Sequence, residues 1–410
     1  MEPLTPTPQA STRITSTRIT SIDALRGLTI AFMILVNDPG DWAHTYAQLD
    51  HAKWNGWTLT DLVFPSFLFL VGCSIVFSTT ARLARGASRT AIALTMFRRA
   101  FYIFLIKMFI TAFPTFHNLT HLRLFGVLTR IALCFLAAGL IFLYFRSAKT
   151  LVAITVAVLL GYWILMRFVP VPGLGHPIHD FPFLDPDHNL AAWIDRAFNA
   201  WCQRWLHTGV LYEHTRDPEG LLSTLPSIAT TLIGVLAGLW LGRVSNPTRP
   251  ITQAQCRNGL LLAGVTCFTL GELWSLTFPI NKNLWTSSYV LLTGGLSLVA
   301  LGLTYWLLDS RKLHHDSRPT RAVLWPLLIF GSNAIVAFAL SNLIVKALAS
   351  WHLPGILNNH PATVWAWLYW RIFARNGSTE NTSLAFALAF VLVCFLPCWL
   401  LWRRKLFLRV

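Results

Sequence analysis

The sequence predicts an all-α fold, a polytopic transmembrane bundle of about ten spanning helices with both termini in the cytoplasm. Of its 410 residues, 54% are hydrophobic and 12% are charged, whereas a typical soluble domain has about 25% charged residues. The mean hydropathy is +0.54. Several apolar runs of about 20 residues are each long enough to cross about 30 Å of hydrocarbon as a helix. A β-barrel would instead show short alternating segments.

Two regions are predicted, a short tail and a transmembrane domain. Residues 1–20 are rich in Ser, Thr and Pro and repeat STRIT at 11–15 and 16–20, which indicates a disordered cytoplasmic tail. Residues 21–410 form the transmembrane domain. Its first apolar run ends in Asn-Asp-Pro-Gly without a cleavage site, so we interpret it as an uncleaved helix rather than a signal peptide. The predicted spans are 22–37, 59–76, 91–113, 125–145, 151–168, 221–241, 260–278, 284–308, 323–348 and 384–402.

The charge distribution sets the orientation and excludes one class of partner. The formal net charge is +16, but Lys and Arg lie at helix ends rather than on a basic soluble face, which argues against nucleic acid. Basic loops alternate with poorly charged ones, as the positive-inside rule requires. We therefore predict a multi-pass membrane protein whose basic loops face the cytoplasm. Its expected location is the bacterial inner (cytoplasmic) membrane. The basic loops are 82–99, 146–149, 243–257, 311–321 and 403–409.

The longest predicted loop, 169–220, is rich in Pro, Asp and His and is predicted to be the largest periplasmic piece. Its middle, 191–210, has helical periodicity, because Trp193, Ala197, Trp201 and Trp205 recur every four residues. This amphipathic helix either caps the bundle or lies at the lipid headgroups. The aromatic segment 365–373 is too short to span, and we place it at the outer interface.

A polar and aromatic stretch, 37–61, lies between the first two spans and faces outward in this topology. A stretch this polar beside a membrane either lines a cavity or is simply solvated. His51 is the candidate general base, since an imidazole titrates near neutral pH, although a solvated histidine fits the composition as well. Asn37 either caps its helix or points a donor into a cavity. Asp61 either caps the second helix or anchors a cationic substrate group.

Long motifs in this chain resemble a known family. In order, they are SIDALRG (21–27), FMILVND (32–38), HAKWNGWTLTDLVFPSFLFLVGCSI (51–75), FGVLTRIA (125–132), DPEGLLSTLPSI (217–228) and NKNLWTSSYV (281–290). Together they resemble the membrane domain of heparan-alpha-glucosaminide N-acetyltransferase and its bacterial relatives. The resemblance covers nearly the whole chain from residue 20.

This resemblance implies a transmembrane acyltransferase domain that uses acetyl-coenzyme A as co-substrate. The family moves acetyl from cytosolic acetyl-coenzyme A to the amino group of a terminal glucosamine across the membrane. Its active histidine corresponds to His51 and its active asparagine to Asn37. The segment between them is longer and bears more Asp residues here, which leaves the natural acceptor open. The implied partners are an amino sugar, coenzyme A and membrane lipid, and a homodimer is left open.

The chemistry of these two residues fits such a transfer. An amine that attacks a thioester must lose a proton, which His51 would take as general base, and the Asn37 amide would donate to the developing oxyanion. An acetyl-histidine intermediate is the competing mechanism. The residues expected to bind the acceptor are Asp61, Asp38, Trp54, Asn55 and Lys282.

Cations near the inner ends of helices are candidates for the coenzyme A phosphates, since guanidinium binds phosphate in bidentate fashion. These candidates are Arg26, Arg98 and Arg99, whose alternative role is contact with lipid headgroups. Arg130 is a further candidate, although it lies in the outer half of its span with expected contacts to the acceptor or to loops. The sequence has no metal-ligand spacing and no Gly-rich phosphate loop.

Two other functions fit parts of the pattern. Charges within the spans and a polar break between helices are also found in a transporter of a small sugar or carboxylate, although we see no inverted internal repeat. An O-acyltransferase of a cell-envelope glycan would use the same machinery on a hydroxyl acceptor.

Overall fold

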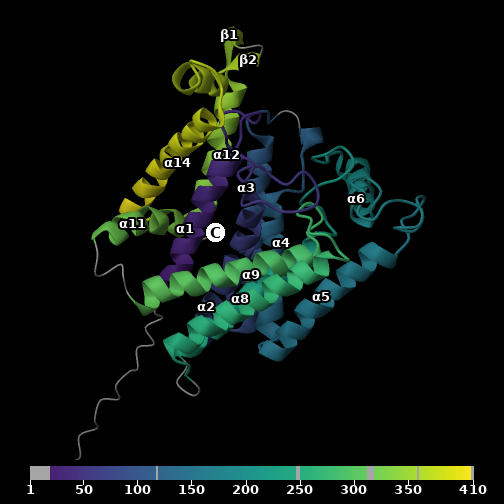
Figure 1. The fold of residues 1–410 in the computed structure, drawn as a ribbon, viewed down its shortest axis with the longest axis vertical. Helices are drawn as coiled ribbons and strands as arrows, with labels where there is room; N and C mark the ends of the chain where they lie inside the picture. The colour runs from purple at the N-terminus through teal and green to yellow at the C-terminus, as the bar shows by residue number, and fades with distance from the viewer. Residues whose placement is uncertain (1–18, 117–118, 246–249, 312–317, 358–359, 408–410) are drawn as a thin grey trace, which may run out of the picture.

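The computed structural model describes residues 19–116, 119–245, 250–311, 318–357 and 360–407, and within them the fold is helical apart from one hairpin (Figure 1). The predicted tail, 1–20, lies outside the described residues except for Ile19 and Thr20. The long helices are α1 (Thr20–Asn37), α2 (Val63–Ala84), α3 (Arg89–Ala112), α4 (Val127–Tyr144), α5 (Ala148–Phe168), α6 (Leu190–Leu206), α7 (Thr224–Gly242), α8 (Gln253–Ser275), α9 (Ser287–Thr304), α11 (Arg318–Ser332), α12 (Ala334–Ser350) and α14 (Glu380–Arg403).

Each predicted span except the ninth coincides with one of these helices. Within the described residues, seven helices are long and apolar enough to cross a membrane, or eight if the bent pair α11–α12 is one span. The chain is therefore a multi-pass membrane protein. Helices α3 and α8, with 24 and 23 residues, have sufficient length but not sufficient apolar character. The count of ten spans and the cytoplasmic placement of both ends stay predictions.

The ninth span, predicted as one helix over 323–348, is wrong. The chain bends by 82° between α11 and α12, at Asn333, whose backbone is not helical. Close packing of α11 on α1 explains the bend. A Cβ atom added at Gly331 would lie 2.1 Å from the carbonyl oxygen of Asp23, and a Cβ atom added at Gly27 would lie 1.7 Å from the carbonyl oxygen of Leu327. Helix α11 thus lies directly on the backbone of α1, and the chain must turn before it can continue as α12.

The bundle core lies among α1, α2, α4, α7 and α9. Helices α2 and α7 approach at backbone distance, since a Cβ at Gly72 would lie 2.0 Å from the Thr231 oxygen and one at Gly234 would lie 1.9 Å from the Phe69 oxygen. Small residues permit this contact, as is common between membrane helices. We call the end of the bundle that holds Asn37 the outer end, and the end where α1 begins the inner end.

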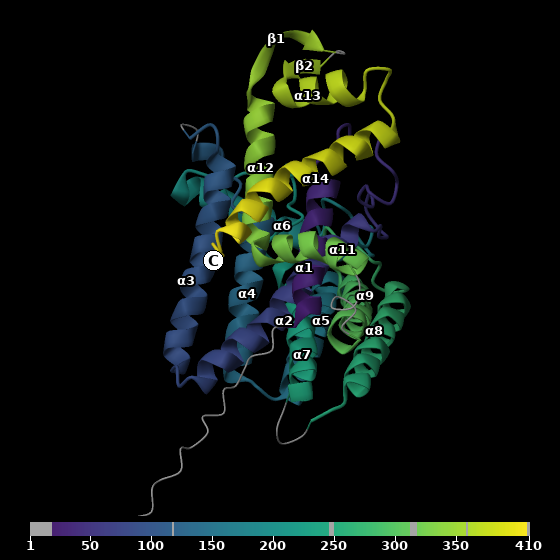
Figure 2. The ribbon, with the colours of Figure 1, turned by 90° about the vertical axis from the view of Figure 1, so that its left-hand side faces the viewer.

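Two outer features lie beyond the bundle core. The helix predicted at 191–210 is observed as α6, with exposed Trp201 and Trp205. A hairpin that the sequence did not predict, β1 (His352–Leu357) and β2 (His360–Thr363), projects with α13 (Val364–Leu368) past the other helices (Figure 2). The predicted aromatic segment 365–373 falls in α13 and the π-helix η5 (Tyr369–Phe373).

Candidate active site

His51 and Asp61 form a hydrogen-bonded pair at the outer end of the bundle. His51 lies in the loop after α1, and Asp61 lies in the 3₁₀ turn η1 (Thr60–Leu62) that leads into α2. The His51 Nδ1 atom is 2.8 Å from Asp61 Oδ1. Because an ionised carboxylate only accepts hydrogen bonds, this contact places the proton of a neutral imidazole on Nδ1 and leaves Nε2 as an acceptor. The imidazole is 41% exposed, so a substrate can reach it.

The Asp61 carboxylate is fixed on both sides. Its side chain is 0% exposed, and its Oδ2 atom accepts the backbone N–H groups of Ala52 at 3.1 Å and Thr58 at 3.0 Å. The cap of α2 is Leu62, without a side-chain hydrogen bond, so the alternative that Asp61 caps this helix is wrong. Its oxygens hold the loop and orient the imidazole of His51. This geometry favours a positioning role over the predicted direct contact with the acceptor.

Lys282 completes a three-residue cluster with this pair. Its Nζ atom lies 2.9 Å from Nδ1 and 3.0 Å from Nε2 of His51, and 3.5 Å from Asp61 Oδ1. The Lys282 side chain is 19% exposed. Burial lowers the pKa of its ammonium group below the ordinary value, and the charge of Asp61 opposes that shift. The structure thus brings together three of the predicted site residues from distant parts of the chain.

The motif NKNLWTSSYV supports this cluster at several points. Asn281 donates from Nδ2 to Asn55 Oδ1 at 3.2 Å, and its own Oδ1 accepts the N–H of Leu284 at 2.9 Å. One residue earlier, the carbonyl of Ile280 accepts the N–H of Gly56 at 2.8 Å. The Tyr289 hydroxyl donates to the backbone oxygen of Asp61 at 2.5 Å. The segment before α9 and the first turn of α9 therefore hold both the loop of His51 and the start of α2.

Trp54, predicted to bind the acceptor, connects the site to the large outer loop. Its indole N–H donates to the Leu184 carbonyl at 2.9 Å, and the Arg216 guanidinium lies 5.0 Å from the ring centroid. Asn55 is exposed but is bonded to Asn281. Both side chains therefore have structural partners beside His51, and their contact with an acceptor stays a prediction.

A second charged cluster beside Lys282 was missed from the sequence. The Arg123 guanidinium donates to Asp217 Oδ2 at 2.7 Å and to Glu219 Oε2 at 2.5 Å. Burial alone would raise the pKa of the Glu219 carboxyl, but the charges of Arg123, Arg130 and Lys282 hold that pKa below its ordinary value. The signal was present in the motif DPEGLLSTLPSI, whose acidic residues stand directly before a predicted span.

Arg130 is buried at 1% exposure between α4, α7 and α9. It donates to the Gly220 carbonyl at 3.2 Å and to the Ser223 hydroxyl, and it lies 5.0 Å from the Trp285 ring centroid. These contacts hold the start of α7 next to the cluster. The inner cavity described next does not include Arg130 among its lining residues, so the predicted contact with coenzyme A is not supported by its position.

A cavity of about 440 Å³ occupies the inner half of the bundle. It is lined by α1, α2, α3, α4 and the break between α11 and α12, and both Arg26 and Arg99 face it. The Arg26 Nε–H donates to the Gly331 carbonyl at 2.7 Å, and the Arg99 guanidinium lies 5.0 Å from the Phe135 ring centroid. Arg98 is exposed on the other face of α3 and does not line the cavity. The sequence predicted both neighbouring arginines to contact coenzyme A, but only Arg99 lines the cavity.

A narrow apolar space continues from this cavity toward the outer end. It is too small for a water molecule and shares Phe67, Ile131 and Ile335 with the cavity. Its residues on α1, Ile30 and Met33, lie one to two turns nearer to Asn37 than Arg26 does. Side chains therefore close the direct path between the cavity and the outer end.

Asn37 and Asp38 end α1 on the outer side. The Asn37 side chain is exposed, and within the described residues its carboxamide has no hydrogen-bond partner, so it is available as a donor. Burial raises the pKa of the Asp38 carboxyl to about 7. We find no contact that joins either side chain to His51, and their predicted roles stay predictions.

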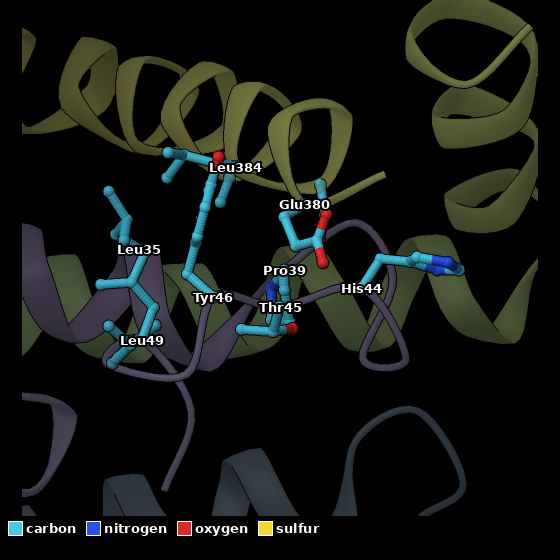
Figure 3. Close-up of a pocket in the computed structure, with 11 residues that line it drawn as sticks. Leu35, Pro39, His44, Thr45, Tyr46, Leu49, Glu380 and Leu384 are labelled. Carbon is cyan, nitrogen blue, oxygen red and sulfur yellow. The ribbon is translucent and has the colours of Figure 1, made fainter. Parts of the chain in front are cut away.

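The segment after Asp38 is attached to α14 rather than to His51. Asp41 accepts from the Ser378 hydroxyl at 2.7 Å and pairs with His44 Nδ1 at 2.8 Å, and the Tyr46 hydroxyl donates to Asn381 at 2.6 Å. A pocket between this segment and α14 has a volume of only about 10 Å³, room for about one water. Figure 3 shows Tyr46 extending toward α14 and His44 pointing away from the other labelled side chains.

Comparison with known proteins relates this sequence to one family. The family model "Heparan-alpha-glucosaminide N-acetyltransferase, catalytic" matches residues 18–268. Heparan-alpha-glucosaminide N-acetyltransferase of Homo sapiens is 32% identical over 361 residues, which cover 78% of this chain and 52% of that protein. The Mus musculus protein of the same name is 30% identical over 380 residues, with 82% and 55% covered. The chain spans about half of the length of these curated relatives.

Proposed function

The chain belongs to the heparan-alpha-glucosaminide N-acetyltransferase family, and from this premise we propose that it transfers acetyl from acetyl-coenzyme A to the amino group of a glucosamine-type sugar. The donor binds from the cytoplasm at the inner end, and the acceptor binds at the periplasmic face of a bacterial inner membrane. The observation that carries the proposal is the His51–Asp61 pair, 2.8 Å apart, at the opposite end of α1 from a cavity lined by two arginines.

The inner cavity fits the phosphates of coenzyme A. Arg26 and Arg99 line it together with Asp23, whose carboxylate pairs with Arg26. Helix α12 begins at the helix break in its wall, so the N–H groups of its first turn add partial positive charge. Non-helical backbone at membrane depth is tolerated where it lines a cavity. These features favour an anionic ligand in this position, and when bound the coenzyme would supply the activated thioester.

The distances along α1 agree with a thioester that reaches the outer end. From Arg26 to Asn37 the helix rises about 16 Å at 1.5 Å per residue. The pantetheine arm of coenzyme A is about as long as four extended residues, or about 14 Å. Its path passes the apolar space lined by Ile30 and Met33. Because this space is closed, we propose that these side chains move aside when the arm enters.

At the outer end, the acceptor amine attacks the thioester carbonyl while His51 Nε2 takes its proton. Asp61 keeps the other ring nitrogen protonated and stabilises the imidazolium that forms. We propose that the Asn37 amide donates to the oxyanion, a contact typically worth about 3 to 4 kcal/mol. The imidazolium then returns a proton to the departing thiolate. An acetyl-histidine intermediate is the alternative, in which His51 Nε2 itself attacks the thioester.

The direct test is acetyl transfer by the purified protein from labelled acetyl-coenzyme A to glucosamine. His51→Ala should lower the rate by about 10²- to 10⁴-fold, the usual contribution of a general base. His44→Ala is the matched control, because His44 lies in the same loop and also pairs with a carboxylate at 2.8 Å. Transfer that survives in His51→Ala would remove His51 from the mechanism. A screen of amine and hydroxyl acceptors separates N-acylation from O-acylation.

One observation favours a second function, transport of a small sugar or carboxylate. A helix broken by 82° beside a cavity is a common feature of substrate sites in transporters. Uptake of such a solute into proteoliposomes without acetyl-coenzyme A would support transport. Acetyl transfer to glucosamine without net uptake would exclude it.

A further inference from the structure

Lys282 places an amino group where the proposed reaction needs its acceptor amine. The Nζ atom lies 2.9 Å from Nδ1 and 3.0 Å from Nε2 of His51, so it lies against the imidazole ring within reach of the nitrogen that is to accept a proton. It also lies 3.5 Å from Asp61 Oδ1. A glucosamine amino group that reacts at His51 would have to occupy nearly the same position. The described structure therefore has its own primary amine in the acceptor position.

This amine has the properties of a nucleophile rather than of a surface lysine. The side chain is only 19% exposed, and burial shifts its protonation equilibrium toward the neutral form. A neutral amine has a free lone pair for the attack, and a small rotation of the Lys282 side chain would direct one N–H toward Nε2. The negative charges of Asp61 and Glu219 oppose deprotonation of the Lys282 ammonium group. The same charges would oppose deprotonation of a protonated glucosamine acceptor.

We propose that Lys282 is a self-acetylation site, and that its amino group takes the acetyl group when no sugar acceptor is bound. The inference rests on the proposed function, since a thioester carbonyl positioned for an amine at His51 is equally positioned for Nζ. In this step the Nζ–C bond forms, the C–S bond breaks, and the proton of Nζ passes to His51 Nε2. Coenzyme A leaves as a thiolate and takes that proton to become the free thiol.

The product would change the site in two ways. Acetylation removes the positive charge that faces Asp61, and it fills the space beside Nε2 with an amide. Because an amide is not a substrate for the reverse attack by a sugar amine at neutral pH, the acetylated protein is blocked. A sugar acceptor that displaces Lys282 protects this lysine from acetylation. Acetylated Lys282 would therefore identify protein that bound acetyl-coenzyme A in the absence of the sugar.

The experiment incubates the purified full-length protein with isotopically labelled acetyl-coenzyme A and no sugar, followed by peptide mass spectrometry. Lys53 is the internal control, because it is an exposed lysine two residues from His51 and reports acetylation by simple chemistry. We expect label at Lys282 about 100-fold or more above Lys53, as proximity and general-base assistance predict. Added glucosamine should slow the labelling, and hydroxylamine should not remove it, although it would remove acetyl from histidine.

Three variants test the role of His51 and the position of the label. His51→Ala and His51→Gln, each checked for folding by thermal unfolding, should reduce label at Lys282 to the level of Lys53, and Lys282→Arg should carry none at that position. If Lys282 stayed unlabelled with acetyl-coenzyme A and no sugar, while the same protein acetylated glucosamine in a separate assay, self-acetylation would be overturned and the proposed function would stand. No transfer to either amine would overturn both. Equal labelling of Lys282 and Lys53 would show chemical acetylation only and would also overturn the inference.

Discussion

Replacement of Asp61 by Asn tests whether the carboxylate determines which ring nitrogen of His51 carries the proton. The side chain is 0% exposed, and its two oxygens accept from His51 Nδ1, Ala52 N and Thr58 N at 2.8 to 3.1 Å. The amide oxygen of Asn can serve the two backbone N–H groups, which turns its NH₂ group toward the imidazole. His51 Nδ1 must then accept, so the proton moves to Nε2 and the base is lost.

The expected effect on the rate of acetyl transfer to glucosamine is a fall of about 10²- to 10⁴-fold, or about 3 to 5 kcal/mol in the barrier. The free energy of unfolding should fall by only about 1 to 3 kcal/mol, the usual loss when a hydrogen bond to a charged group is weakened. Affinity for coenzyme A should be unchanged, because the arginine-lined cavity lies at the other end of α1. The assay is the initial rate with labelled acetyl-coenzyme A, together with thermal unfolding and coenzyme A titration.

A matched control lies in the same loop. Asp41 pairs with His44 Nδ1 at the same 2.8 Å, but its other contacts are to Ala43 and Thr45 in its own loop and to residues in and before α14. Asp41→Asn should therefore keep transfer within a few-fold of the wild-type rate. If folded Asp61→Asn transferred acetyl at the wild-type rate, or if Asp41→Asn lost as much activity, the tautomer argument would be refuted.

Three further predictions follow from other regions. Arg99→Ala should weaken coenzyme A binding about 10- to 100-fold, whereas Arg98→Ala on the exposed face of α3 should not, as measured by calorimetric titration. Met33→Trp should fill the apolar space and slow acetyl transfer at least tenfold, while coenzyme A still binds. Leu28→Trp is the control, because Leu28 on α1 is 49% exposed, and it should leave the rate of transfer unchanged. Burial raises the pKa of Asp195 to about 7, so its folded form retains a proton that the unfolded chain has released. Stability should therefore fall as pH rises from about 4 to 7, and Asp195→Asn should raise the melting temperature more at pH 8 than at pH 5.

The sequence predicted the helices well because each apolar run has its own signal. A span needs about 20 apolar residues, and that requirement does not depend on the neighbours of the helix. The break after Ser332 had no such signal, because it depends on the contact of Gly331 with α1. A contact between segments 300 residues apart leaves no pattern in the local hydropathy.

The site was predicted only in part, because some of its contacts also join segments that are far apart in the sequence. His51 was found because a histidine in a long polar motif is conspicuous, but spacing could not distinguish a cap from a partner at Asp61. The 3₁₀ turn before α2 directs this carboxylate back toward the loop, and a turn of that kind has no sequence signature of its own. Glu219 was missed because its interactions with Arg123 and Lys282 form only in the folded bundle.

The segment 38–50 is held by residues outside the part of the chain that the family model matches. The loop residues Asp41 and Tyr46 bond to Ser378, Ser383 and Asn381 in and before α14, whereas the family model ends at residue 268. The His51–Asp61 pair and the part of the inner cavity on α1–α4 lie within the residues that the family model matches, whereas the part of the cavity at the break between α11 and α12 lies outside them. The segment 38–50 is held by residues in and before α14, which also lie outside the match. If this segment selects the sugar, substitutions at the start of α14 should change the preference among acceptors, while the rate on glucosamine stays within a few-fold and the affinity for coenzyme A is unchanged. Specificity and chemistry would then be encoded in separate parts of the chain.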